Sequence, residues 1–280
     1  MTDYKAIISQ MDFKSTATRR QIVLDFLNAN LVPYELHHYE TGTNVIVKLG
    51  NPNADSYAAV SSHLDRYNRA GGANDNGAAL ATCLEFIVQY IKRPLQKSVL
   101  VFFFDEEETG LRGSTAYAKA FGVMHIDSMI NMELVGTGRY GILWPVISNP
   151  NAITQKLINI SSTISNKKDS SQPNQSNILL NDSILPMPEF PLQFSDADAF
   201  KKAGLRNAIT FTRITKNDYE SAKSYLEAFD SGTTEEALFE FMDKSETLKT
   251  YHRPSDTAFG IDPECIYANV TLINLALNEV

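Results

Sequence analysis

The sequence predicts an α/β fold with three layers, in which a central mixed, mostly parallel β-sheet is flanked by helices on both faces. The first reason is the run at residues 99–104, Val-Leu-Val-Phe-Phe-Phe, which is apolar throughout and typical of a strand buried on both faces. The second is the alternation of such strands with helical patterns from residue 57 onward. The third is a chain of 280 residues with 43% hydrophobic and 21% charged residues, an ordinary composition for one large globular domain.

The elements before the core strand follow from a helix cap, alternating apolar residues and glycine-containing turns. In chain order they are a helix capped by Ser15 and running to about Asn30, strands at 34–39, 44–49 and 57–62, a Gly-rich loop at 71–77 and a helix at 78–91.

The elements after the core strand continue the same alternation. They are a helix at 114–121, a strand at 129–134, helices at 151–164 and 195–203, a strand at 208–212, and helices at 218–229, 235–249 and 263–278.

The chain shows no internal repeat and no break in composition, so we predict a single domain over residues 1–280. Residues 1–43 would supply an N-terminal helix and an edge strand. Residues 166–192, which are polar and then proline-rich, and residues 213–250 are expected to be surface or site-covering insertions.

Composition excludes several classes of function. A net charge of −8 and a pI near 5.2 argue against a nucleic-acid partner. No apolar run reaches transmembrane length, and the N-terminus lacks the basic and apolar regions of a signal peptide. We therefore expect a cytoplasmic protein without a membrane partner, or a secreted one if a leader was removed. Cys83 and Cys265 are far apart, in apolar helical contexts, and are expected to be buried free thiols.

Four consecutive acids, residues 105–108, stand at the end of the predicted core strand. Ligand sites of open α/β sheets lie just beyond the carboxyl ends of the strands. Like charges in such a place repel each other unless a positive group is near. The sequence therefore predicts a metal site at this edge of the sheet.

Other potential ligands also follow predicted strands that should be neighbours, and a second imidazole comes from the C-terminal third. Two histidines, one bridging carboxylate and two terminal carboxylates are a typical set for a pair of zinc ions. A further carboxylate must then act as the base; Glu107 and Glu108 are adjacent, so one can bind metal while the other faces the attacking water. The candidates are His63, Asp75, Glu107, Glu108, Glu133 and His252.

Six motifs, in this order from about Asn44 to the C-terminus, resemble those of the dizinc aminopeptidases of the bacterial leucyl aminopeptidase type, zinc metallopeptidases related to glutaminyl cyclases. They are His63-Leu-Asp65, Gly72-Ala-Asn-Asp75-Asn-Gly, Glu107-Glu108-Thr-Gly-Leu-Arg-Gly-Ser114, Asn131-Met-Glu133, Ser195-Asp196 and His252-Arg-Pro-Ser-Asp256.

The resemblance implies a phosphorylase/hydrolase-like, zinc-peptidase fold and a peptide substrate with a free N-terminus. It implies two Zn²⁺ per chain, with Co²⁺ or Mn²⁺ as substitutes, and leaves the oligomeric state open. It also implies that the Asp75–Asn76 peptide bond is cis. By this resemblance Asp75 would bridge the two metal ions, His63 and Glu133 would complete one metal site, and Glu108 and His252 would complete the other. Glu107 would be the general base, and Asp65 would orient His63.

The sequence departs from the pattern at Glu133, where many members have Asp, and in the length of residues 213–250. Relatives use a tyrosine to stabilise the oxyanion, for which Tyr219, Tyr225 and Tyr251 are candidates. Trp144, residues 186–194 and Phe211 are candidates for a hydrophobic pocket.

Alternative functions are a glutaminyl cyclase, which uses one metal and performs no hydrolysis, and a carboxypeptidase or deacylase. The retention of both histidines, the bridging acid and the double Glu favours two metals and an aminopeptidase. A non-catalytic binding module is disfavoured because every expected ligand position holds a metal-binding residue.

Overall fold

The computed structural model describes residues 2–146, 150–166, 184–187, 195–230, 240–241 and 243–278, without the side chains of 162–166 and 228–230. Its centre is an eight-stranded sheet in which the neighbouring strands β4, β3, β5 and β8 run parallel. From one edge to the other, the strands are β1 (Glu35–His38), β2 (Thr43–Leu49), β4 (Val99–Phe104), β3 (Tyr57–His63), β5 (Ile126–Met132), β8 (Ala208–Ile214), β6 (Tyr140–Trp144) and β7 (Ile184–Pro186).

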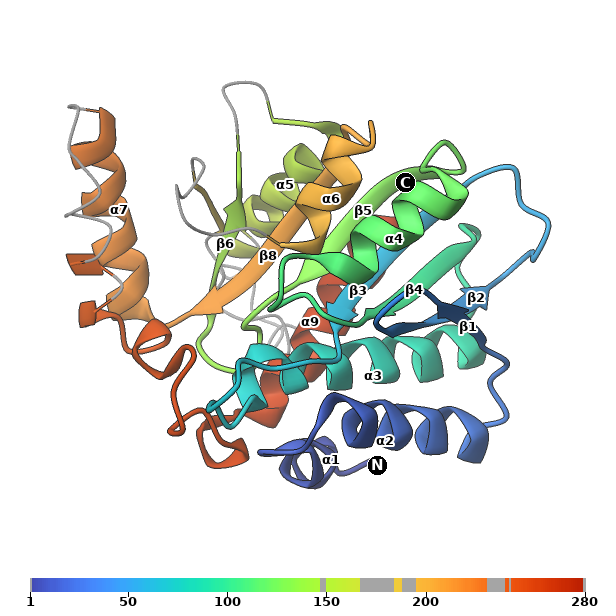
Figure 1. Cartoon of the computed structure of the whole chain (residues 1–280). Helices are drawn as coiled ribbons and strands as arrows, with labels where there is room; N and C mark the ends of the chain where they lie inside the picture. Colours follow the sequence, from blue (N-terminus) through green and yellow to red (C-terminus); the bar gives the residue numbers. More distant parts are fainter. Residues whose placement is uncertain are drawn as a thin grey trace.

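Helices cover both faces of the sheet, which confirms the predicted three-layer fold (Figure 1). Successive side chains of a strand point to opposite faces. Accordingly, Val101 and Phe103 pack with α3 (Ala78–Lys92) and α9 (Pro263–Leu277), whereas Phe102 and Phe104 pack with the helices of the other face. The latter are α4 (Arg112–Phe121) and α6 (Asp196–Lys202).

The remaining helices lie around this core. The N-terminal helices α1 (Tyr4–Met11) and α2 (Thr16–Ala29) lie outside α3 (Figure 1). Helix α5 (Ala152–Asn166) contributes Ile153 and Leu157 to the core of the α3 face. Helix α7 (Lys216–Asp230) packs Ala222 and Tyr225 beside Trp144 in a separate apolar cluster. The short helical turns are η1 (Ala73–Gly77), η3 (Leu248–Thr250) and η4 (Ala258–Gly260).

Most elements agree with those predicted from sequence. Ser15 caps α2, its side chain accepting from the Thr18 amide, and both cysteines are buried and not joined in a disulfide, as expected. Sequence reasoning missed α1, β6 and the short β7. Strand β8 extends to Ile214, so the predicted insertion at 213–250 begins inside a core strand.

The predicted helix at 235–249 was wrong at its C-terminal end, while residues 235–239 lie outside the described residues. The helix does not continue beyond Lys244, and Leu248–Thr250 is a 3₁₀ turn. The reason is Asp218 on α7, whose carboxylate accepts from the amides of Glu246 and Thr247 at 2.7 and 2.9 Å. These bonds turn the chain, because they draw away amides that a continuing helix would use internally.

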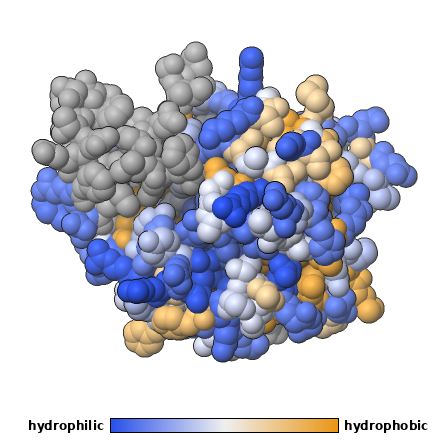
Figure 2. All heavy atoms as spheres, in the orientation of Figure 1, coloured by the Kyte–Doolittle hydropathy of each residue, from blue (hydrophilic) through white to orange (hydrophobic). Residues whose placement is uncertain are grey.

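The surface is largely hydrophilic on the face shown in Figure 2, with scattered apolar side chains. Large apolar side chains that are highly exposed, such as Leu31, Met124 and Phe259, come from separate elements. None of the helices in the described ranges has the length and apolar character that a membrane span requires.

Candidate active site

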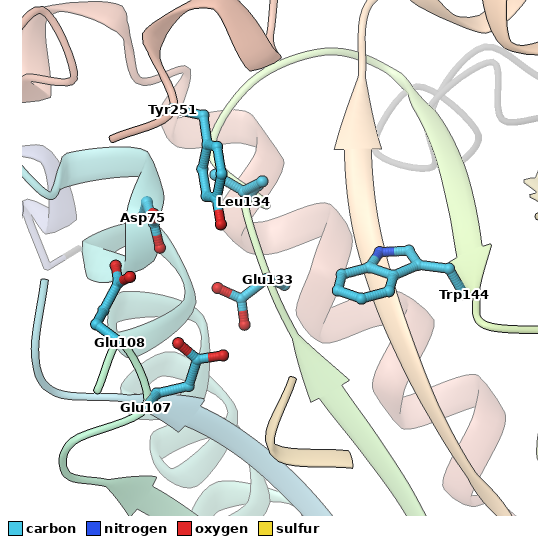
Figure 3. Close-up of a pocket in the computed structure, with 7 residues that line it drawn as sticks. All are labelled: Asp75, Glu107, Glu108, Glu133, Leu134, Trp144 and Tyr251. Carbon is cyan, nitrogen blue, oxygen red and sulfur yellow. The ribbon is translucent and has the colours of Figure 1, made fainter. Parts of the chain in front are cut away.

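The predicted site residues meet at the carboxyl ends of the parallel strands. His63 is the last residue of β3 and pairs with Phe104, the last residue of β4. The turn after β4 carries Glu107 and Glu108, and Glu133 directly follows the end of β5. Figure 3 shows the side chains of Glu107, Glu108 and Glu133 converging with that of Asp75 on one space.

The loop between β3 and α3 positions Asp75. The carboxylate of Asp256 accepts from the amides of Asn74 and Asp75 at 2.7 and 3.0 Å. Gly72 takes a left-handed conformation with a φ of 82°, and a Cβ there would lie 2.6 Å from Nη1 of Arg19. The Asp75–Asn76 peptide bond is cis, as the resemblance implied. The loop is therefore fixed by contacts on both sides before any ligand binds.

The two oxygens of Asp75 belong to two separate groups of ligand atoms. Oδ1 lies 3.2 Å from Nε2 of His63, which is 2.9 Å from Oε1 of Glu133. Oδ2 lies 3.5 Å from Nε2 of His252, which is 3.0 Å from Oε2 of Glu108. The geometry thus provides two groups, each with one imidazole and one further carboxylate, and Asp75 is common to both.

The chemistry of these atoms fits metal ions. One ligand atom from each of His63, Asp75 and Glu108 lies within 4.8 Å of the others. Asp75 Oδ2, Glu108 Oε1 and His252 Nε2 are buried and accept or donate no conventional hydrogen bond within the described chain. Buried polar atoms without partners are costly unless something else satisfies them. Imidazole nitrogens with carboxylate oxygens are a donor set that zinc accepts.

Asp65 supports both halves of the site from behind. Its carboxylate accepts from the amides of Glu107 and Glu108, each at 3.0 Å. Its Oδ1 also lies 3.3 Å from Nδ1 of His63. One buried carboxylate therefore fixes the ring of His63 and the turn that carries the two glutamates, as a group behind a metal ligand does.

The electrostatics reflect a concentration of acids in a buried place. Burial raises the pKa of Glu107 well above its ordinary value, and raises the pKa of Glu133 to about 7. Burial alone would lower the pKa of His63, but Glu133, Asp65 and Asp75 raise it above the usual value. Burial would raise the pKa of Asp75, yet His63 and His252 hold it below its usual range. Positive charge is thus strongly favoured here.

Comparison with known sequences agrees with the site. Residues 44–276 match the sequence model of Peptidase family M28. The chain belongs to this family. The match covers the site residues and leaves α1 and α2 outside it, and it confirms the family resemblance carried by the six motifs.

Individual relatives of the family are distant. A vacuolar membrane protease from Schizophyllum commune is 31% identical over 107 residues, which is 38% of this chain and 12% of that protein. A zinc aminopeptidase from Bacillus subtilis, BSAP, superposes with a TM-score of 0.61 at 20% identity, over 84% of this chain and 49% of that one. A glutaminyl cyclase from Bacteroides thetaiotaomicron, bound to N-acetylhistamine, superposes with a TM-score of 0.69 at 14% identity, over 99% of this chain and 97% of that one. At these identities the structural likeness shows the fold alone.

The structure separates the three tyrosines that sequence left open within this M28 site. The hydroxyl of Tyr251 points into the space between Asp75 and Glu133 (Figure 3). Tyr219 instead packs on Tyr140 with ring centroids 4.8 Å apart. Tyr225 packs on Phe241, with ring centroids 6.2 Å apart. Burial raises the pKa of Tyr251, so its hydroxyl keeps its proton.

An aromatic wall limits the pocket on one side. Trp144 and Leu134 line it together with the acids and Tyr251 (Figure 3). The indole Nε1 of Trp144 donates to Oγ1 of Thr212 at 2.9 Å, which fixes the ring. Phe211 packs in the core, and residues 188–194 of the other proposed lining segment lie outside the described residues.

Sequence reasoning missed a buried cation behind the site. Arg19 is fully buried, donates from Nη2 to the Gly72 carbonyl at 3.2 Å, and is attracted by Asp65, Asp75 and Asp256. The signal was present, because Arg19 lies four residues before Val23 on the buried stripe of α2. Burial lowers the pKa of Arg19 to about 10, so it remains charged at neutral pH.

Two acids that belong to the family motifs also have structural positions that sequence did not assign. Asp256 holds the Asp75 loop, as described above. Asp196, at the start of α6, is completely buried and its pKa is raised by burial to about 7, with opposing attraction from His63. Its charge also contributes to the raised pKa of Glu107.

Proposed function

We propose that this chain is a zinc aminopeptidase that removes N-terminal residues from peptides with a free N-terminus, using two zinc ions per chain. The observation that carries the proposal is the division of Asp75 between two ligand groups, with His63 and Glu133 on one side and Glu108 and His252 on the other. The family assignment supports a peptidase. The buried ligand atoms without hydrogen-bond partners, Asp75 Oδ2, Glu108 Oε1 and His252 Nε2, support a metal at the group that contains His252.

Zinc ions bound at this site would supply an activated water and a Lewis acid for the scissile carbonyl. In our proposal, Glu107 takes the proton of the attacking water and passes it to the leaving amine, because it lines the pocket while Glu108 faces His252. The Tyr251 hydroxyl donates to the oxyanion that develops on the substrate. Asp65 holds His63 and the Glu107 turn in place.

The proposed choice of substrate follows from charge. One acid of the pocket lining, Glu107, belongs to neither metal group, and a carboxylate in this place suits the cationic N-terminus of a peptide. Trp144 and Leu134 offer an apolar wall for the side chain of the first residue. The same acidic surroundings disfavour nucleic acid as a partner.

A glutaminyl cyclase is the second candidate, favoured by the superposition with the Bacteroides thetaiotaomicron cyclase over nearly the whole of both chains. Zinc aminopeptidases and glutaminyl cyclases share this fold, so the choice between the two functions depends on the residues of the site. The presence of two complete ligand groups favours the enzyme with two metals. Glu133 in place of the more usual Asp gives a carboxypeptidase or deacylase some support.

Mass spectrometry of a peptide panel incubated with the zinc-loaded protein tests the proposal. The panel contains free, N-acetylated and N-terminal-glutamine peptides. The Glu107→Gln variant is the control for contaminating peptidases. Stepwise loss of N-terminal residues from free peptides alone is the expected result. Loss of ammonia only, from the glutamine peptides, would identify a cyclase, and cleavage of acetylated peptides would identify a deacylase or carboxypeptidase.

A further inference from the structure

The two imidazoles of the site are held in different ways. The side chain of His63 is 1% exposed, and its Nδ1 lies 3.3 Å from Oδ1 and 3.1 Å from the carbonyl oxygen of Asp65. The side chain of His252 is 28% exposed, and its backbone has a φ of 58°. Across the described ranges no group forms a hydrogen bond with Nδ1 of His252. A histidine that binds metal is ordinarily oriented through a hydrogen bond of its other ring nitrogen, whereas the described side chains that touch the His252 ring from outside the ligand group stack on it.

Two aromatic rings stack on the imidazole of His252. The ring of Tyr67 is stacked on the imidazole with centroids 4.1 Å apart and an interplanar angle of 7°. The ring of the adjacent Tyr251 lies 3.7 Å away at 25°. A nearly parallel stack fixes the plane of the imidazole and therefore the direction of its Nε2, which faces Asp75 and Glu108.

The loop that carries Tyr67 is itself held rigidly. The guanidinium of Arg66 donates to a set of backbone carbonyls on this loop and on the turn after α1, namely those of Phe13, Lys14, Tyr67, Asn68 and Ala70. The amide of Gly71 donates to the carbonyl of Arg253 at 3.3 Å. A Cβ at Gly71 would lie 1.9 Å from the Asp256 carbonyl oxygen, so the loop touches the segment of His252 directly.

We propose that Tyr67 is a positioning residue for His252. The face of its ring orients the imidazole of His252, as the hydrogen bond to Asp65 orients that of His63. The inference rests on the proposed function, in which His252 binds the second zinc ion. Tyr67 holds the imidazole while the residue itself remains 45% exposed, at the outer edge of the site. An imidazole that donates electrons to a cation becomes electron-poor, and the negative face of a tyrosine ring favours that state.

The test measures the affinity of the whole chain for zinc by chelator competition, with the metal content counted by mass spectrometry. His252→Ala identifies the second ion, the one proposed to bind at Glu108 and His252. This variant should lose that ion and keep the ion at His63 and Glu133. Tyr67→Ala and Tyr67→Leu should weaken the second ion several-fold, up to about tenfold, and leave the first unchanged. Tyr67→Phe keeps the stack and should match the wild type. Arg69→Ala is the matched control, since Arg69 is exposed on the same loop.

A positioning role also predicts that excess zinc restores peptide hydrolysis to the Tyr67→Ala variant, which a loss of folding would not allow. The proposal is overturned if Tyr67→Ala and Tyr67→Leu bind the second ion as tightly as the wild type, if they weaken both ions equally, or if Tyr67→Phe weakens it as much as they do. A wild type that binds fewer than two ions, or an unchanged count in His252→Ala, would overturn the proposed dizinc site and this inference with it.

Discussion

Asp75 faces two histidines with different oxygens: its Oδ1 lies 3.2 Å from Nε2 of His63, and its Oδ2 lies 3.5 Å from Nε2 of His252. His63 ends a central strand and His252 comes from the C-terminal third of the chain, so the fold brings together distant segments at one carboxylate. Asp256 fixes this carboxylate by accepting from the amide of Asp75 itself. The arrangement explains why a cluster of acids is tolerated in a buried site.

Replacing Glu107 by Gln should separate catalysis from metal binding. The amide cannot accept the proton of the attacking water, but its size is preserved and Glu107 belongs to neither ligand group. We expect unchanged zinc content and a loss of peptidase activity of about 10²–10⁴-fold, measured as kcat/KM. Full activity with a normal zinc content would remove Glu107 from its proposed role.

Replacing Tyr251 by Phe should slow the chemical step with little effect on substrate binding. The hydroxyl is proposed to contact charge that develops only as the reaction proceeds, so kcat should fall about 100-fold while KM changes little. The ring remains beside His252, so zinc content should hold. Tyr219→Phe is the control, because that ring packs away from the site; equal losses in both variants would contradict the assignment.

Arg19 should matter for stability as well as for the site. Its replacement by Met removes a buried cation from three carboxylates and one of the two donors to the Gly72 carbonyl, which keeps the Gly77 amide at 3.0 Å. We expect the free energy of unfolding of the metal-free protein to fall by about 1.5–3 kcal/mol, measured by urea denaturation. Arg93→Met, at an exposed position, should change it little. An Arg19→Met variant as stable as the wild type would show that the charge is compensated elsewhere.

The metal-free protein should lose stability as the pH rises. Burial raises the pKa of Glu133 and Asp196 to about 7, and that of Asp256 to about 6. In an unfolded chain such carboxyl groups have pKa values of about 4. Between this pH and the pKa values of the folded state, the folded protein binds more protons than the unfolded chain. Its free energy of unfolding therefore falls as the pH rises through this range. The raised pKa of His63 acts in the same direction at higher pH.

The measurement is the Tm of chelator-treated protein at about pH 5.5 and about pH 8, with and without zinc. A lower Tm at the higher pH is expected for the metal-free form. Zinc should reverse the trend, because it favours the ionised carboxylates. Asp196→Asn should reduce the difference in the metal-free form. A metal-free Tm that rises with pH would be inconsistent with these shifts.

Sequence patterns predicted the layers of the fold because core strands such as β4 are apolar on both faces and their neighbours alternate with helices. They also predicted that His63, Glu107, Glu108 and Glu133 meet, because the carboxyl ends of parallel strands share one edge. The place of His252 beside Glu108 was implied by the family resemblance. They could not predict the contact of Arg19 with the Gly72 carbonyl or the stack of Tyr67 on His252. Those contacts join segments far apart in the chain, and no local periodicity encodes such a pairing. Strand β7 was missed because three residues carry too little pattern.

Anomalous diffraction at the zinc absorption edge, from crystals of the zinc-loaded protein, shows directly whether two zinc ions share the carboxylate of Asp75. We expect two peaks, one on each side of Asp75: one beside His63 and Glu133 and the other beside Glu108 and His252. Asp75→Ala should remove both peaks, because the two sites share its carboxylate. A single peak in the wild type, or zinc bound without contact to Asp75, would show that Asp75 is not shared between two zinc ions.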